Sequence, residues 1–212
     1  MDLTEFLQYI PKIKTEALPG ESAHQKMIPP ERISFMENIN WAEFSPRKAA
    51  VMMLLYPKNN TTHLVLILRN SYKGIHSSQV GFPGGKVEAY DSSLEAAALR
   101  ETYEEIGIPT EKMTVIRAFS EVYIPPSNFI VYPFLGYSTE VLSFIPDPRE
   151  VSGIIEVSLQ DFLHDSAVTT EIMATSYMKE NPMPVFQFGE HTVWGATGMI
   201  LSELKEVLKS VL

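Results

Sequence analysis

Apolar residues along the chain occur partly in short unbroken runs and partly with helical spacing. The runs at 50–55 and 63–68 predict two buried strands, and the segment from Lys58 to Asn60 between them predicts a hairpin turn. Further strands are predicted at residues 115–122, 129–137, 154–159 and 185–188. This alternation of strands with a few helices predicts an α/β sandwich built around a mixed sheet.

After residue 45, two segments have the spacing of helices, and the glycine-rich stretch Gly81 to Gly85 predicts a loop before the first of them. Residues 94–106 predict one helix, and residues 199–212 predict an amphipathic helix at the C-terminus. Its apolar stripe, which predicts packing against the core, consists of Ile200, Leu201, Leu204, Val207, Leu208 and Val211.

Residues 1–45 predict an N-terminal extension, and residues 46–212 predict the main domain. In the extension, apolar residues from Leu3 to Ile10 have helical spacing until Pro11 interrupts it, so this part is expected to be partly helical. The pair Pro19-Gly20 predicts a loop. The extension contains no recognisable catalytic or ligand-binding motif.

Composition narrows the class of protein. Of 212 residues, 45% are hydrophobic and 20% are charged, which is typical of a soluble globular protein. The net charge of -9 and the lack of a basic patch argue against nucleic acid as a partner. The chain has no cysteine, which excludes disulfides and thiolate chemistry. No signal peptide or membrane span is expected, and a cytoplasmic location is the expectation.

The predicted helix at 94–106 carries the most informative chemistry. Ser92 and Glu95 fit a capping box at its start, and Gly107 suits a left-handed position just past its end. An apolar stripe is expected at Ala96, Leu99, Tyr103 and Ile106. On the opposite side, Glu101, Glu104 and Glu105 are expected to share one face because they are three and four residues apart.

Three carboxylates on one helical face repel one another, and a divalent cation removes that repulsion. Oxygen ligands suit Mg²⁺ or Mn²⁺, and Arg100 is placed to hold Glu104 in position. Taken alone, the glutamate cluster would more simply be a solvated acidic face. The full string from Arg100 to Gly107 is much rarer, with a chance frequency on the order of one in a million per position.

The segment resembles the Nudix box, which is a glycine, five residues, a glutamate, seven residues and then Arg-Glu-x-x-Glu-Glu-x-Gly. Gly85 matches the first glycine, and the string from Arg100 to Gly107 matches the end of the box. Asp91 stands where the glutamate is usual, and eight residues separate it from Arg100. In both departures the sequence resembles the coenzyme A pyrophosphatase branch of the family. The resemblance implies a Nudix-type α/β/α sandwich with a mixed sheet.

Other motifs of that branch extend the resemblance to residues 48–212. The upstream motif is matched by Arg69, His76, Gln79, Val80, Phe82, Pro83, Gly84 and Gly85. Downstream matches are Ser127, Phe129, Pro133, Gly136, Glu150, Val151 and the run from Trp194 to Thr197. Departures are Asn70, where the branch has Ser or Ala; Gly74, where it has a second Arg; and Ser78, where it has Gly.

The resemblance also implies roles for individual residues. Glu101, Glu104 and Glu105 are expected metal ligands, with the Gly85 carbonyl as a fourth, and Arg100 supports them. Glu150 and the box glutamates are the candidate bases that activate water. Arg69, Lys73, His76 and Gln79 are the expected substrate contacts, with Lys73 compensating for the missing arginine at Gly74. Plain alternatives are a structural salt bridge for Arg69, a packed residue for His76 and a solvated loop charge for Glu150.

The expected function is metal-dependent hydrolysis of a pyrophosphate in a small nucleotide, with coenzyme A or an acyl-coenzyme A as the first expectation. The products would be 3',5'-ADP and 4'-phosphopantetheine. ADP-ribose, NADH and dinucleoside polyphosphates are the alternative substrates within the family. A non-catalytic nucleotide-binding regulatory module is the alternative from another class, although such a module would be expected to have lost box glutamates. A homodimer is compatible with the sequence.

Overall fold

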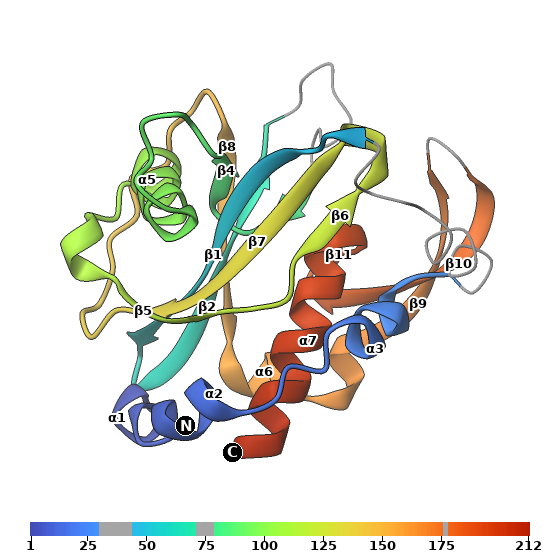
Figure 1. Ribbon diagram of the computed structural model, residues 1–212. Coiled ribbons are helices and arrows are strands. Elements are labelled where there is room, and N and C mark those ends of the chain that lie inside the picture. Colours follow the sequence, from blue (N-terminus) through green and yellow to red (C-terminus); the bar gives the residue numbers. More distant parts are fainter. Residues whose placement is uncertain (30–43, 71–78, 176–177) are drawn as a thin grey trace.

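The fold was analysed in a computed structural model that describes residues 1–29, 44–70, 79–175 and 178–212. A mixed sheet forms its centre (Figure 1). The strands of this sheet are β1 (Arg47–Lys58), β2 (Thr61–Arg69), β3 (Val80–Gly81), β4 (Gly84–Lys86), β5 (Thr114–Ala118), β6 (Val122–Ile124), β7 (Phe129–Tyr137) and β8 (Val151–Ser158). Only β1 and β7 pair in parallel within this described sheet; its other pairings are antiparallel.

Helices cover both faces of the sheet. The helix α5 (Leu94–Ile106) lies on one face, while α7 (Gly195–Val211) and α6 (Leu159–Leu163) lie on the other (Figure 1). Strand β1 divides its side chains between the two sides by simple alternation. Met52 and Leu54 join the core under α5, and Met53 and Leu55 join the core under α7. The α/β/α sandwich with a mixed sheet is therefore confirmed.

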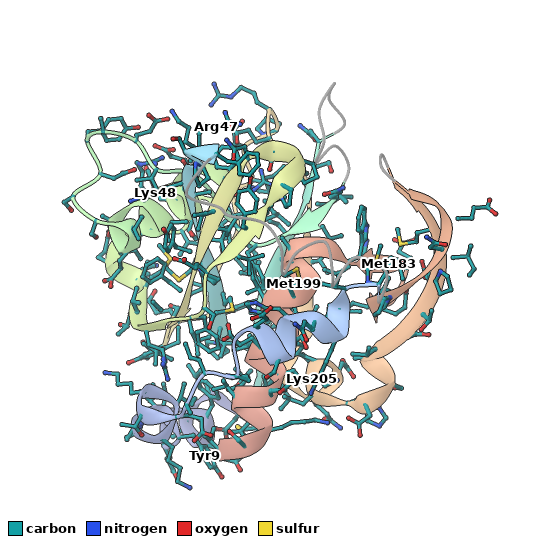
Figure 2. All side chains as sticks on the ribbon, turned by 45° about the vertical axis from the view of Figure 1, so that its right-hand side comes forward. Tyr9, Arg47, Lys48, Met183, Met199 and Lys205 are labelled. Atoms are coloured by element: carbon teal, nitrogen blue, oxygen red, sulfur yellow. The ribbon has the colours of Figure 1, made fainter. Side chains whose placement is uncertain are left out.

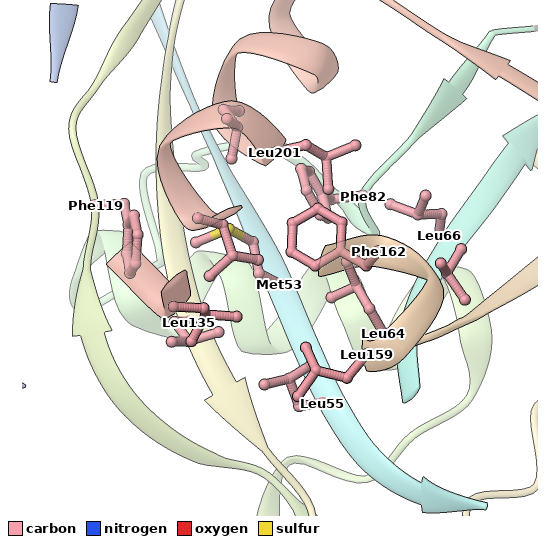
Figure 3. Close-up of a cluster of buried hydrophobic side chains, with 14 of the residues drawn as sticks. Met53, Leu55, Leu64, Leu66, Phe82, Phe119, Leu135, Leu159, Phe162 and Leu201 are labelled. Carbon is pink, nitrogen blue, oxygen red and sulfur yellow. The ribbon is translucent and has the colours of Figure 1, made fainter. Parts of the chain in front are cut away.

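The core under α7 is the larger of the two. Figure 3 shows it as a layer of aliphatic and aromatic side chains that includes Phe162 of α6, Leu201 of α7, and Leu64 and Leu66 of β2. All six residues of the apolar stripe predicted for the C-terminal helix are buried. A second sheet of three strands extends beside this core, formed by β9 (Val168–Thr175), β10 (Met178–Phe188) and β11 (His191–Val193). The strand predicted at 185–188 is the end of β10.

Several predicted elements have the expected place. The turn between β1 and β2 is a two-residue loop, because Lys58 pairs with Thr61 and both Asn59 and Asn60 have positive φ. Gly107 ends α5 in the left-handed conformation. Near the N-terminus, α1 (Leu3–Leu7) is followed by α2 (Ile10–Thr15), so Pro11 lies in the first turn of a new helix.

Two predicted segments differ from the structure. The stretch from Gly81 to Gly85 is not simply a loop, because β3 pairs with β2 and β4 pairs with β1. The single strand predicted at 115–122 is two strands, β5 and β6, which pair with different parts of β7. The break occurs at Ser120, whose backbone N–H and hydroxyl both donate to the carboxylate of Glu203 instead of continuing the ladder.

Glu203 also joins the N-terminal segment to the rest of the fold. It is fully buried on α7, and its carboxylate accepts a hydrogen bond from the backbone N–H of Gly20 at 3.0 Å. The imidazole of His24, in the short helix α3 (Glu21–His24), lies 3.5 Å from the same carboxylate. Phe6 and Ile13 belong to the core under α7. The described part of residues 1–45 therefore shares its core with the strands.

Replacing Glu203 tests this attachment. Glu203→Ala leaves three donors without their acceptor, so we expect the free energy of unfolding to fall by about 3 kcal/mol or more. Urea unfolding followed by circular dichroism measures the change. Glu206→Ala on the same helix is the matched control, because it breaks only the surface pair with Lys26 and should cost at most about 1 kcal/mol. Equal losses in the two variants would show that Glu203 does not secure the N-terminal segment.

Candidate active site

The start of α5 differs by one residue from the expected capping box. Ser93, not Ser92, has the extended backbone of an N-cap, and its hydroxyl accepts from the N–H of Ala96 at 3.0 Å. Glu95 then lies in the first turn, where a negative charge interacts favourably with the helix dipole.

The inward face of α5 matches the predicted stripe only in part. Ile106 is buried and Leu99 packs against the core, but Tyr103 is 54% exposed, and Ala97, Ala98 and Thr102 are buried in addition. Short alanine side chains let the helix lie close to β1, and the face is rotated so that Glu105 points inward with only 2% of its surface exposed. The three glutamates therefore do not share one solvent face. The Glu104 side chain is 51% exposed, and the Glu101 side chain is largely covered.

Glu105 is held by donors from two other elements. Its Oε1 accepts from Arg69 Nη1 at 3.1 Å, and its Oε2 accepts from the backbone N–H of Gly84 at 2.8 Å. Arg69 Nη2 also donates to the carbonyl of Gly84 at 2.8 Å. The carboxylate thus joins the end of β2, the glycine segment and α5. Burial raises the pKa of Glu105 to about 7, with the charges of Glu101 and Glu150 adding to the rise and Arg69 and the Gly84 N–H opposing it.

Arg100 arranges the other carboxylates. Its Nη1 donates to Glu101 Oε1 at 2.7 Å and to Glu104 Oε2 at 2.8 Å. Its Nε and Nη2 form a bidentate pair with Asp91 at 2.8 and 2.9 Å, and the hydrogen bonds from Arg100 are the main cause that lowers the pKa of Asp91. The shorter Asp91 side chain therefore reaches Arg100 across the longer eight-residue spacing.

Gly84 and Gly85 place the glycine segment close to both β1 and α5. A Cβ atom on Gly85 would lie 2.4 Å from Oε2 of Glu101, so the carboxylate packs directly on the glycine backbone. Gly84 has φ of +148°, and a Cβ there would lie 2.4 Å from the carbonyl oxygen of Ala50. Only glycine allows this close approach of two backbones and a carboxylate.

The two glycines give a paired test. In Gly85→Ala the added methyl group meets only the end of the Glu101 side chain, so we expect the carboxylate to move and kcat to fall by about 10-fold or more. The melting temperature should change by only a few degrees. Gly84→Ala meets backbone and should instead destabilise the fold by about 2 kcal/mol or more. Thermal unfolding and steady-state kinetics separate the two effects. Wild-type kcat in Gly85→Ala would show that activity does not depend on the close packing of the Glu101 carboxylate on Gly85.

Glu150 interacts electrostatically with the two inner glutamates from the start of another strand. It precedes β8, its backbone carbonyl accepts from the N–H of Asn70 at 2.9 Å, and its charge contributes to the raised pKa of both Glu101 and Glu105 after their burial. Gln79 is next to Arg69, whose N–H donates to the Gln79 carbonyl at 3.1 Å. Lys73 and His76, together with Gly74 and Ser78, lie outside the described residues.

Further cations and a downstream motif border the glycine segment. Arg47 and Lys48 begin β1, and Figure 2 places them together at one end of the molecule, far from Tyr9. The Lys48 carbonyl accepts from the N–H of Val87 at 2.9 Å. The start of α7 is close as well, because Thr197 and Arg69 both flank Gly81. Neither Arg47 nor Lys48 was singled out from the sequence. The Lys48 backbone pairs beside the box, whereas the Arg47 side chain donates to the Ser127 carbonyl and lies over the Phe129 ring.

The donor set fits a hard divalent cation. Five carboxylates gather here with two guanidinium groups, from Asp91, Glu101, Glu104, Glu105, Glu150, Arg69 and Arg100. Negative charge therefore exceeds positive charge, and all the acidic donors are oxygen atoms, which suit Mg²⁺ or Mn²⁺. Within the described ranges, no three acidic or histidine side chains already converge as a metal cage. In part this reflects Arg100, which occupies one oxygen each of Glu101 and Glu104.

In this α/β/α sandwich the glutamate helix packs on the glycine segment, which brings the two ends of the box together. The profile of the NUDIX domain matches residues 46–174, and the chain belongs to the Nudix hydrolases, which cleave pyrophosphate bonds. Proteins of this family bind small nucleotides and generally use divalent metal ions. No helix in the described ranges is long and apolar enough to cross a membrane.

Three Nudix hydrolases from other organisms are similar to this chain in sequence. The mitochondrial coenzyme A diphosphatase NUDT8 of Mus musculus is 33% identical over 158 residues, covering 73% of this chain and 75% of the relative. The Nudix hydrolase NudL of Photorhabdus laumondii is 31% identical over 160 residues, covering 76% and 84%. The chloroplastic Nudix hydrolase 22 of Arabidopsis thaliana is 29% identical over 196 residues; the match covers 89% of this chain but only 63% of that relative.

Solved structures agree on the fold. The Nudix hydrolase RenU of M. smegmatis superimposes with a TM-score of 0.55 at 18% identity, covering 79% of this chain and 88% of that chain. A MutT/nudix protein of Enterococcus faecalis gives a TM-score of 0.54 at 17% identity, covering 92% and 76%.

The raised pKa of Glu105 predicts a pH dependence. Between its ordinary value of 4.5 and about 7, the unfolded state loses the proton while the folded state keeps it. Without metal, the free energy of unfolding should therefore fall as pH rises through this window, by at most about 3 kcal/mol at 1.36 kcal/mol per pH unit. Mg²⁺ or Mn²⁺ should raise the melting temperature more at pH 8 than at pH 5, because a ligand must be ionised.

Urea unfolding across this pH range, in EDTA and in metal, measures the effect. Glu105→Gln is the control, since it removes this titrating group and should make the slope between pH 4.5 and 7 shallower, leaving the part due to Glu101. The same slope in wild type and Glu105→Gln would contradict the assignment to this carboxyl.

Proposed function

We propose that this Nudix hydrolase cleaves the pyrophosphate of coenzyme A or an acyl-coenzyme A and releases 3',5'-ADP and 4'-phosphopantetheine. The main support is the similarity to a coenzyme A diphosphatase at 33% identity over 73% of the chain. The arrangement of Asp91 with Arg100 is a second support, because the shortened acid and lengthened spacing of that branch form an intact bidentate pair here.

We infer that Glu101, Glu104 and Glu105 hold Mg²⁺ or Mn²⁺ beside Gly85. A divalent cation bound there would neutralise charge on the pyrophosphate and make a water molecule more acidic. Arg100 keeps Glu101 and Glu104 oriented, and Asp91 keeps Arg100 in place. Arg69 is already paired with Glu105 and leaves one face toward Gly81, where a phosphate oxygen would find a guanidinium donor.

Glu150 is our candidate for the base that accepts the proton of the attacking water. It reaches the site from a separate loop, and it is not paired with either arginine of the site in the described structure. Water attacks one phosphorus atom, the bond from that phosphorus to the bridging oxygen breaks, and the other phosphate leaves. Lys73, His76 and Gln79 stay predicted substrate contacts. Arg47 and Lys48 are additional candidates for the anionic end of the substrate.

Three further expectations belong to this proposal. The identity of the ion as Mg²⁺ or Mn²⁺, the homodimer and the cytoplasmic location stay predictions. The names of the relatives include mitochondrial and chloroplastic forms, so the compartment does not follow from the family.

Product analysis by mass spectrometry tests the substrate. The protein is incubated with Mg²⁺ or Mn²⁺ and, separately, with coenzyme A, ADP-ribose, NADH or a diadenosine polyphosphate. We expect 3',5'-ADP from coenzyme A only when metal is present. Glu104→Gln, which removes one charge but keeps the shape, should lower kcat on the order of 100-fold.

Each other outcome has a distinct meaning. Cleavage of ADP-ribose, NADH or a dinucleoside polyphosphate in preference to coenzyme A would overturn the proposed substrate and leave the family's reaction intact. Unchanged hydrolysis by Glu104→Gln would overturn the assignment of the metal ligands.

A further inference from the structure

The loop at residues 147–150 carries Glu150 into the site and is attached to two different elements. At one side, the N–H of Asp147 donates to the carbonyl of Glu105 at 2.9 Å, which ties the loop to the C-terminal turn of α5. At the other side, the loop meets the end of β2. The loop therefore spans the same two elements that the Arg69–Glu105 ion pair joins.

Asn70 connects the loop to the end of β2 through its backbone N–H and its side-chain amide. Its backbone N–H donates to the carbonyl of Glu150 at 2.9 Å, and its side-chain Nδ2 donates to the carbonyl of Pro148 at 2.6 Å. Pro148 has no N–H, so its carbonyl is the only backbone group through which Asn70 can hold it. Because Asn70 follows Arg69 directly, the two residues hold the loop and Glu105 from one strand end.

Strand pairing alone does not fix this loop. The β2–β8 register shifts between Leu68 and Arg69, and Arg69 pairs with Val151 as the last step of the ladder. Beyond that step, Arg149 turns back to an ion pair with Asp147 inside the loop, which connects the loop to itself and not to β2. In the described structure, the side-chain connection between the loop and β2 at this point is the one from Asn70.

We propose that Asn70 is a positioning residue for the hydrolysis, which holds the 147–150 loop against the end of β2 and so places the Glu150 carboxylate beside Glu101 and Glu105. This inference rests on the proposed function, because that proposal makes Glu150 the base in the reaction. Asn70 itself does not touch the reacting atoms. Its effect passes through Glu150 and is absent once Glu150 has lost its carboxylate.

A double-mutant cycle of Asn70→Ala and Glu150→Gln tests this inference on the best substrate found for the wild type. We expect Asn70→Ala to lower kcat by about 10-fold, within the range for residues that orient a functional group, and to leave KM within about twofold. In the Glu150→Gln background, the same change should alter kcat by less than about twofold, because the two residues act as one unit.

A second variant and a control separate positioning from folding. Asn70→Asp keeps the shape but replaces the donor with a carboxylate facing the Pro148 carbonyl, so its kcat should fall at least as far as that of Asn70→Ala. Ser152→Ala removes a comparable hydrogen bond between Ser152 Oγ and the Leu68 carbonyl, 3.0 Å apart, and should leave kcat unchanged. Melting temperatures establish that each variant is folded at the assay temperature.

Several results would overturn the inference. They are wild-type kcat in both Asn70 variants, an equal loss from Asn70→Ala with and without Glu150, and wild-type kcat in Glu150→Gln. In each of these cases the wild type still hydrolyses its substrate with metal, so the proposed reaction survives, although wild-type kcat in Glu150→Gln would also remove Glu150 as the base. Absence of metal-dependent hydrolysis by the wild type, on every substrate tried, overturns both the proposed function and the role of Asn70.

Discussion

The site depends on the hydrogen bonds that the buried carboxylate of Glu105 accepts. A carboxylate inside a protein must find donors, and Glu105 finds them in Arg69 and in the backbone N–H of Gly84. These contacts set the rotation of α5 on the sheet, and they bring Gly85 against Glu101. The placement of Glu101 and the exposure of Glu104 follow from that rotation, since residues one helical turn apart move together.

This rotation explains what the sequence could and could not predict about the site. The box residues, the helix bounds and Gly107 follow from local pattern, which is why residues 94–106 were predicted correctly. The predicted apolar stripe was right at Leu99 and Ile106 but wrong at Tyr103, because polarity is a poor guide where a carboxylate is buried by partners from other elements. Arg69 was predicted from a motif, but its pairing with Glu105 is a contact between residues 36 positions apart.

The fold shows the same division. Apolar runs and turn residues predicted β1, β2, their asparagine turn and the C-terminal helix, because each is encoded by neighbours in sequence. The break between β5 and β6 was missed because its cause is Glu203, 83 positions away from Ser120. Asn70 was noted only as a departure from the family motif. Its two acceptors, at Pro148 and Glu150, come into reach only when β8 pairs with β2.

The two buried glutamates Glu203 and Glu105, on opposite faces of the sheet, have pKa values shifted in opposite directions. Burial alone would raise the pKa of Glu203, but the His24 imidazole 3.5 Å away and the hydrogen bonds from Ser120 outweigh it and lower the pKa. At Glu105, burial is the largest contribution and outweighs the charge of Arg69 and the hydrogen bond from the Gly84 N–H, and the charges of Glu101 and Glu150 raise the pKa further. Glu203 is thus satisfied by the chain itself, as a structural link needs. The ionised form of Glu105 stays unfavourable in the chain alone, and a bound cation would stabilise it.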